Sequence, residues 1–112
     1  MELRFADQRL QRLAESAVRS DTHFGTRDGA LLRQRLCELM AVDNLAIAAA
    51  VPTLDLKPFP SGAEGFVVTV RPRLRLLFEI AGAARRLAGN GEVDLTTVET
   101  IRLLAIEECD EP

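Results

Sequence analysis

Residues 66–80 of the chain read FVVTVRPRLRLLFEI, and this stretch decides the expected fold. Apolar side chains recur at every second position before and after Arg71-Pro72-Arg73. A period of two is typical of a β-strand with one buried face, so the stretch predicts two strands. The three residues between them are few enough for a tight turn, and we therefore expect an antiparallel hairpin.

The segments on either side of the hairpin predict more strands and a group of helices. In chain order we expect a strand over residues 2–5, a helix capped by Asp7 and interrupted at residues 20–25, a helix over about 27–42, a short helix over 45–50 capped by Asp43, a strand over 53–57, the hairpin, an irregular segment over 81–95, and a strand over 98–106. Helices and strands that are segregated in this way predict an α+β fold. The N-terminal helices would pack on a small twisted, mainly antiparallel sheet.

Composition predicts one domain over residues 1–112, since 47% hydrophobic content is enough for a core. The chain has no apolar run of the roughly 20 residues that a membrane span needs, and its first ten residues contain charges where a signal peptide would need an apolar stretch. We expect a cytoplasmic protein with no membrane contact. Cys37 and Cys109 are expected to be free thiols, with Cys37 packed in or near the core. The single histidine and the two distant cysteines have no zinc-binding spacing.

Arginines are the side chains most suited to a function. Of the 14 basic residues in this chain of net charge −3, 13 are arginine, which favours bidentate contacts with phosphate or carboxylate. Arg71, Arg73 and Arg75 recur at period two and would share a side if the strand geometry continued through the turn. The turn could also rotate the first two away, and this leaves Arg75 on a sheet face.

Three anions could lie among these arginines: RNA phosphates, an acidic partner segment or the acidic C-terminal residues of the chain. Alternatively, the hairpin is a solvated edge on which Arg75 pairs with Glu79 or Glu107. Lys57 precedes the hairpin and could neutralise a developing phosphate charge, or it could be an ordinary surface charge. His23 is expected to be a surface residue that flanks a helix.

Four stretches resemble a known family when they are taken together: LLRQRLCEL at 31–39, DNL at 43–45, RLLFE at 75–79 and TIRLLAIE at 100–107. Their order and spacing resemble the HigB branch of the RelE/ParE toxin superfamily over residues 27–108. The resemblance implies the toxin of a type II toxin–antitoxin system, with helices on a twisted antiparallel sheet. Such a toxin is a ribosome-dependent mRNA endonuclease that inhibits translation without a metal ion or other cofactor.

The resemblance also implies partners and site residues. The partners would be the ribosome with its mRNA and a HigA-like helix-turn-helix antitoxin, through which alone operator DNA is bound. The implied catalytic residues are Arg75, which matches the family arginine, Lys57 in place of a histidine, and Arg73 in place of a polar residue. The RNA-binding set that we expect is Arg71, Arg73, Arg75, Arg85 and Arg86. The family ending with Tyr and His corresponds here to Glu108-Cys109-Asp110, which has neither.

Because those acid–base groups are absent, two other readings stay open. The first is a toxin-fold protein that acts by binding, as a ParE-like gyrase inhibitor or a decayed toxin with weakened catalysis. The second is an unrelated α+β interaction module that dimerises through a sheet edge.

Overall fold

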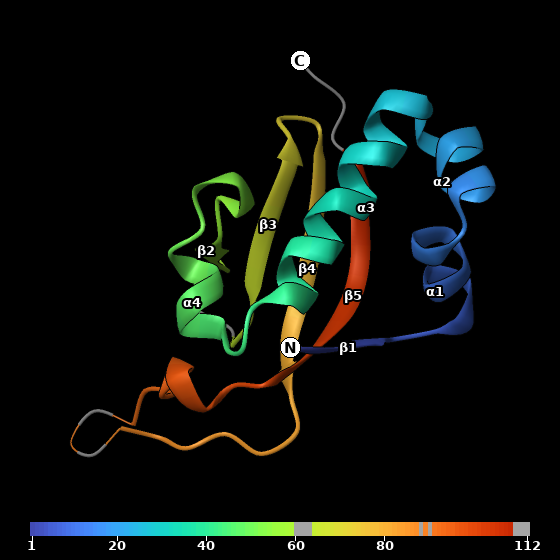
Figure 1. The fold of residues 1–112 in the computed structure, drawn as a ribbon. Helices are drawn as coiled ribbons and strands as arrows, with labels where there is room; N and C mark the ends of the chain where they lie inside the picture. The colour runs from blue at the N-terminus through green and yellow to red at the C-terminus, as the bar shows by residue number, and fades with distance from the viewer. Residues whose placement is uncertain (60–63, 88, 90, 109–112) are drawn as a thin grey trace.

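The predicted hairpin forms the middle of a five-stranded sheet in the computed structural model (Figure 1). The structure describes residues 1–59, 64–87, 89 and 91–108. The strands are β1 (Glu2–Phe5), β2 (Lys57–Pro58), β3 (Phe66–Arg71), β4 (Leu74–Ala81) and β5 (Thr100–Glu108). Their order across the sheet is β1-β5-β4-β3-β2, with β1 parallel to β5 and the other described neighbours antiparallel. The sheet is therefore mainly antiparallel, as predicted.

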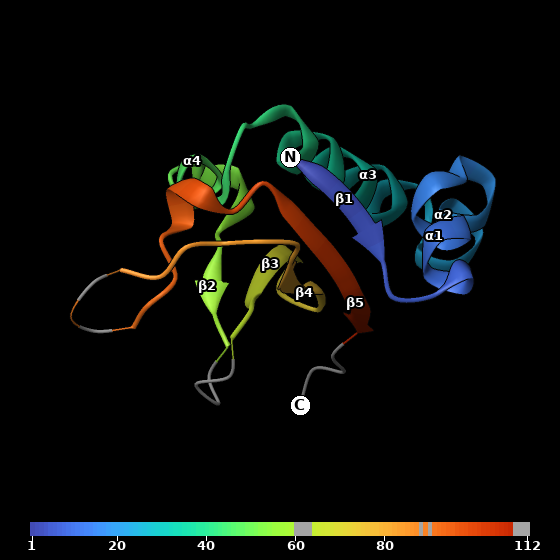
Figure 2. The same cartoon turned by 90° about the horizontal axis from the view of Figure 1, so that it is seen from below.

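The helices leave one face of the sheet without a helical cover among the described residues. They are α1 (Gln8–Glu15), α2 (Ala17–Phe24), α3 (Thr26–Ala41) and α4 (Leu45–Ala49), with 3₁₀ turns η1 (Pro52–Leu54) and η2 (Leu95–Thr97). The helices α3 and α4 lie on one side of the sheet, and α1 and α2 flank the edge formed by β1 and β5 (Figure 2). This arrangement confirms the predicted α+β fold.

The core lies between α3 and the covered face of the sheet. Alternate residues of β3 and β4 enter it, and the rings of Phe66 and Phe78 stack with their centroids 5.0 Å apart. The stripe of α3 that packs on them includes Leu32, Leu36 and Leu39, all nearly inaccessible to solvent. Burial of each such side chain contributes about 1.5–3 kcal/mol, so the alternation of the hairpin and the stripe of α3 together hold the layers.

Two helix boundaries differ from the sequence prediction. The expected break at residues 20–25 is confined to Gly25, because residues 20–24 are helical, and a further break lies earlier, at Ser16. The Ser16 hydroxyl accepts a hydrogen bond from Arg19 N and so begins α2. The buried Ser20 hydroxyl donates to the carbonyl of Ser16, which satisfies it inside the helix. The cap of α4 is Asn44, one residue after the predicted Asp43.

The predicted strand over residues 53–57 was also wrong. Pro52–Leu54 form a 3₁₀ turn that buries Leu54, and Asp55 has a φ of 43°, which extended backbone cannot adopt. Of the predicted strand, only Lys57 belongs to a strand, β2. Cys37 is a free, exposed thiol and does not enter the core. It lies about 100° around α3 from Leu36, whose side chain occupies the core stripe.

A close approach between α2 and α3 depends on Gly29. A Cβ on Gly29 would lie 2.4 Å from Asp21 Oδ1 and 3.0 Å from both Asp21 N and the Ser20 carbonyl carbon. We expect Gly29→Ala to destabilise the protein by roughly 1–2 kcal/mol, since overpacking outweighs the better helix propensity of alanine. Urea unfolding would measure the change, with Ala30→Gly on the exposed side of α3 giving the propensity difference alone. A more stable Gly29→Ala protein would contradict the tight contact.

In the part of the chain that the structure describes, no helix combines the length and the apolar character that a membrane crossing requires.

Candidate nucleic-acid interface

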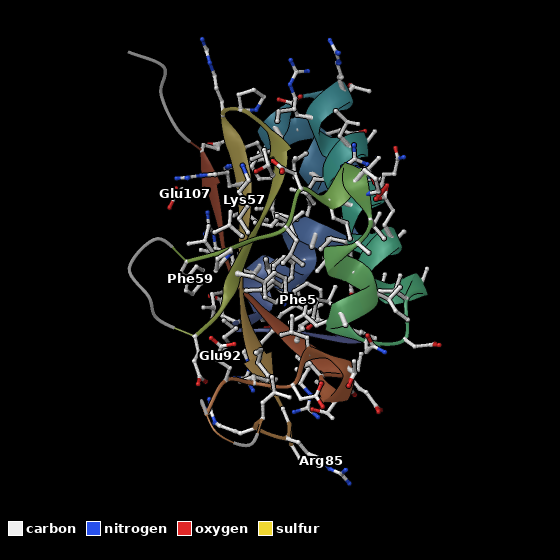
Figure 3. All side chains as sticks on the ribbon, turned by 90° about the vertical axis from the view of Figure 1, so that its left-hand side faces the viewer. Phe5, Lys57, Phe59, Arg85, Glu92 and Glu107 are labelled. Atoms are coloured by element: carbon white, nitrogen blue, oxygen red, sulfur yellow. The ribbon has the colours of Figure 1, made fainter. Side chains whose placement is uncertain are left out.

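The uncovered face of the sheet brings two of the predicted catalytic residues onto neighbouring rows. Residues directly opposite each other on adjacent strands project from the same face. One row consists of Thr69, Arg75 and Glu107, which are paired across β3, β4 and β5. In the next row Lys57 lies opposite Val67. Figure 3 shows Lys57 and Glu107 on the side of the sheet that faces away from the helices.

Arg75 is held on this face by Glu107. The Arg75 Nη2 atom donates a hydrogen bond to Glu107 Oε1, and both side chains are 39% exposed. Glu107 is one of the two carboxylates that the sequence predicted as partners of Arg75. An ion pair at this exposure contributes little to stability, about 0–1 kcal/mol. It does fix the direction of the planar guanidinium group, and such a group suits carboxylate and phosphate ligands.

A second pair of the same kind lies further along the same face. Arg102 of β5 donates to Glu79 of β4, and both side chains are 36% exposed. The two pairs match in residue type, strands and exposure, although the arginine and the glutamate have exchanged strands. The Arg102–Glu79 pair is therefore a natural internal reference for Arg75.

Lys57 keeps an ammonium group on the open face. Its Nζ atom lies 3.7 Å from Asp55 Oδ1, and the lysine side chain is 70% exposed. Phe59 packs beside it against Gly65, where a Cβ would lie 2.3 Å from the Phe59 ring. Val67 and Leu77, opposite each other on β3 and β4, lie in the same row as Lys57 and are partly buried. The face thus combines cations with half-buried apolar side chains.

The turn directs the other two hairpin arginines differently. The register shifts between Thr69 and Arg71, and the Arg71 Nη1 atom lies 3.2 Å from Asp28 Oδ1 of α3. Arg71 therefore points to the helical side, while Arg75 points to the open face. Arg73 is exposed in the turn itself. The structure does not bring all three arginines to one side, and this agrees with the rotation that the sequence analysis left open.

Arg85 and Arg86 lie apart from Arg75. They belong to the segment after β4, and Figure 3 shows Arg85 at the opposite end of the molecule from Glu107. Arg86 forms an ion pair with Glu64 and donates to the Gly91 carbonyl over 3.0 Å. An RNA that contacts Arg75 would have to follow the full length of β4 to reach these two arginines.

The Glu64–Arg86 pair makes a testable pKa prediction. A hydrogen bond from Arg86 is the main cause that lowers the pKa of Glu64; burial opposes it, and the positive charge of Arg86 adds a smaller lowering effect. A lowered carboxyl pKa stabilises the fold above the unfolded-state pKa, and the contribution is lost as pH falls through the folded-state pKa. We expect Arg86→Gln to raise the pKa of Glu64 towards its ordinary value, as measured by an NMR titration of the carboxylate. An unchanged titration would show that the pair is not formed in solution.

The acid–base groups that metal-free cleavage would use are scarce around Arg75. The chain has no tyrosine and a single histidine, His23, which α2 carries. His23 is exposed, as predicted. Folding also brings its Nε2 atom to 3.9 Å from Glu108 Oε2 at the end of β5. The carboxylates of Glu107 and Asp55 are the nearest acidic groups to Arg75 and Lys57 that the structure places. Cys109 and Asp110 lie outside the described residues.

Chemically, the open face can bind an anion by two cations on adjacent rows. The guanidinium of Arg75 supplies a planar pair of donors, and Lys57 supplies a mobile point charge. Neither group is a good base near neutral pH, so the face is better suited to holding a phosphate than to removing a proton. Comparisons with protein-family models, with curated proteins and with solved structures found no match to this chain.

Proposed function

We propose that this protein is a HigB-like toxin of the RelE/ParE superfamily that binds mRNA in the ribosome and cleaves it. The observation that supports the proposal most directly is the placing of Arg75 and Lys57 on one uncovered sheet face, on neighbouring rows. The α+β fold and the stretches that resemble the family are consistent with it. The cellular partner would be a HigA-like helix-turn-helix antitoxin, and translation would be the process inhibited.

Charge stabilisation would be the main contribution of this face to cleavage. When a ribose 2′-hydroxyl loses its proton to solvent and attacks the adjacent phosphate, negative charge grows on the phosphate oxygens. The bond to the 5′-oxygen of the next nucleotide then breaks, that oxygen takes a proton from solvent, and a 2′,3′-cyclic phosphate is left. Arg75 would meet that charge with two parallel N–H donors, after partly exchanging its contact with Glu107 for the phosphate. Lys57 would stabilise the same oxygens from the neighbouring row. Holding the strand in line for attack would supply the remaining rate enhancement.

Inducible expression in a bacterial host tests the proposal. We expect growth arrest on induction, relieved by co-expression of a helix-turn-helix protein from the adjacent reading frame. Mapping of transcript 5′ ends should show new cuts within translated messages, and a translation inhibitor that empties the ribosomal A site should remove them. Arrest with intact transcripts would rule out the cleavage mechanism.

A binding-only toxin is the second candidate, and the scarcity of acid–base groups near Arg75 favours it. Such a protein would inhibit its target by occupying it, as a ParE-like gyrase inhibitor does. It predicts induction of the DNA-damage response with intact transcripts. A decayed toxin predicts unaffected growth.

A further inference from the structure

The helices α1 and α2 form a groove that is separate from the hairpin. Its volume is about 480 Å³, within the range of ligand sites, and it is open to solvent. The residues that line it are Arg9, Arg12 and Leu13 of α1, and Arg19, Thr22 and His23 of α2. Arg9 and Arg12 are three positions apart on α1, so their Cβ atoms are about 5–6 Å apart on one face. Five of these six residues are polar or charged, and three are arginines.

The acidic groups of the two helices are engaged elsewhere. Asp7 accepts a hydrogen bond from Leu10 N at 2.8 Å as the cap of α1, and Glu15 accepts one from Gln11 at 3.3 Å. Asp21 pairs with Arg33 of α3, with 2.9 Å between Oδ1 and Nη1. None of these three carboxylates forms an ion pair with an arginine of the groove.

The arginines of the groove differ in this respect from most others in the protein. Seven arginines form ion pairs between described residues: Arg4, Arg33, Arg35, Arg71, Arg75, Arg86 and Arg102. Within the described residues, Arg9, Arg12 and Arg19 have no ion pair and no side-chain hydrogen bond, and all three are exposed. Like charges without counterions repel each other, so an acidic chain that gathers them in one groove leaves a site for an external anion.

We propose that this groove binds the phosphate backbone of RNA, as a second contact that positions the RNA beside the Arg75 face. The identification of the anion as RNA rests on the proposed function. Protein–nucleic acid interfaces are strongly positively charged, and three arginines line this groove. Thr22 adds a neutral hydroxyl donor of a kind that commonly contacts phosphate oxygens.

The groove and the Arg75 face meet at the end of β5. Glu107 and Glu108 are consecutive there; Glu107 holds Arg75, and Glu108 lies 3.9 Å from His23 of the groove. The neighbouring strand β1 pairs with β5 only as far as Leu103. Among the described residues, the last part of β5 therefore has no strand partner on that side, and the Arg75 face adjoins the groove there.

The test is RNA binding by the purified full-length protein, measured by fluorescence anisotropy with a labelled RNA stem–loop over a series of salt concentrations. Each phosphate contact contributes about 0.7–0.9 to the slope of log affinity against log salt. We expect the triple variant Arg9→Gln, Arg12→Gln, Arg19→Gln to lower the slope by about 2–3 and the affinity by about tenfold or more at moderate salt. The single variant Arg27→Gln is the control for loss of an arginine outside the groove, because Arg27 is an exposed arginine of α3. It should lower the slope by less than 1.

Circular dichroism and urea unfolding of the triple variant establish that it is folded. If the variant is unfolded, the lysine variant Arg9→Lys, Arg12→Lys, Arg19→Lys replaces it and should keep the slope while binding more weakly. An unchanged slope in a folded triple variant would overturn the proposal, as would displacement of the RNA by a polyglutamate peptide at a lower concentration than by unlabelled RNA. The cleavage proposal can fail while the groove proposal holds. In that case transcripts stay intact in cells, but the salt slope of RNA binding still depends on the three arginines.

Discussion

Arg75→Ala is expected to reduce transcript cleavage by roughly a hundredfold to a thousandfold, as the loss of one transition-state donor does in other enzymes. Glu107 across the strand pair holds the guanidinium of Arg75 on the open face. In the proposed mechanism, removing Arg75 deletes two donors for the phosphate. Arg75→Lys should recover part of the activity, since it keeps the charge but not the planar pair of donors. The measurement is the rate of cutting of a defined message on ribosomes programmed in vitro.

Arg102→Ala is the control for this prediction. It removes an arginine from the same face, from the same two strands and from an ion pair of nearly the same exposure. Any cost in stability from losing a surface pair is therefore matched, and cleavage by Arg102→Ala should stay close to that of the parent protein. Equal losses in the two variants would point to a structural role for Arg75. Undiminished cleavage in Arg75→Ala would remove it from the mechanism.

Phe78→Ala is expected to destabilise the protein by about 3–5 kcal/mol. The side chain is fully buried on β4, the central strand, and stacks on Phe66 with an angle of 10° between the ring planes. Its removal leaves a cavity between the sheet and α3 that neighbouring side chains cannot fill completely. A domain of this size has a total stability of about 5–15 kcal/mol, so the variant would lose a large share of its stability. Urea unfolding followed by circular dichroism measures the change.

Phe59→Ala is the control that removes the same kind of side chain from a less buried position. Phe59 is partly exposed on the open face, so its truncation removes less buried surface and should cost clearly less than that of Phe78. The slope of unfolding free energy against urea should be similar in both variants, because the surface exposed on unfolding changes little. If the two truncations cost the same, the covered side of the sheet is not the main core.

The regular elements followed from local patterns. Alternation over residues 66–80 predicted β3 and β4, and the leucine stripe of the helix predicted over 27–42 placed α3 correctly. Helix boundaries that depend on polar residues were predicted less accurately, because Ser, Asp and Asn can cap a helix or satisfy their hydrogen bonds within one. Ser20 was expected to break a helix, but burial against α3 and a bond to its own helix keep it helical.

The candidate site was only partly accessible to sequence reasoning. Lys57 and Arg75 were identified as cations, but their neighbouring rows depend on the register of three strands. The direction of Arg71 depends on a register shift beside the turn, which composition does not specify. The arginine groove was not predicted, since Arg9 and Arg19 belong to helices whose packing is set by contacts with α3. The i, i+3 spacing of Arg9 and Arg12 was the available signal.

The amino-acid sequence by itself determined the α+β class, the central hairpin and the arginine-rich chemistry, because strand period, helix period and residue type are local properties. Only the tertiary structure decided which arginines have partners. Glu107 lies 32 residues from Arg75, and pairing of β4 with β5 brings them together. The same folding pairs Arg71 with Asp28 and leaves the arginines of α1 and α2 without an acidic partner among the described residues. Charge neutralisation depends on distances in space, and those distances follow from strand register and helix packing.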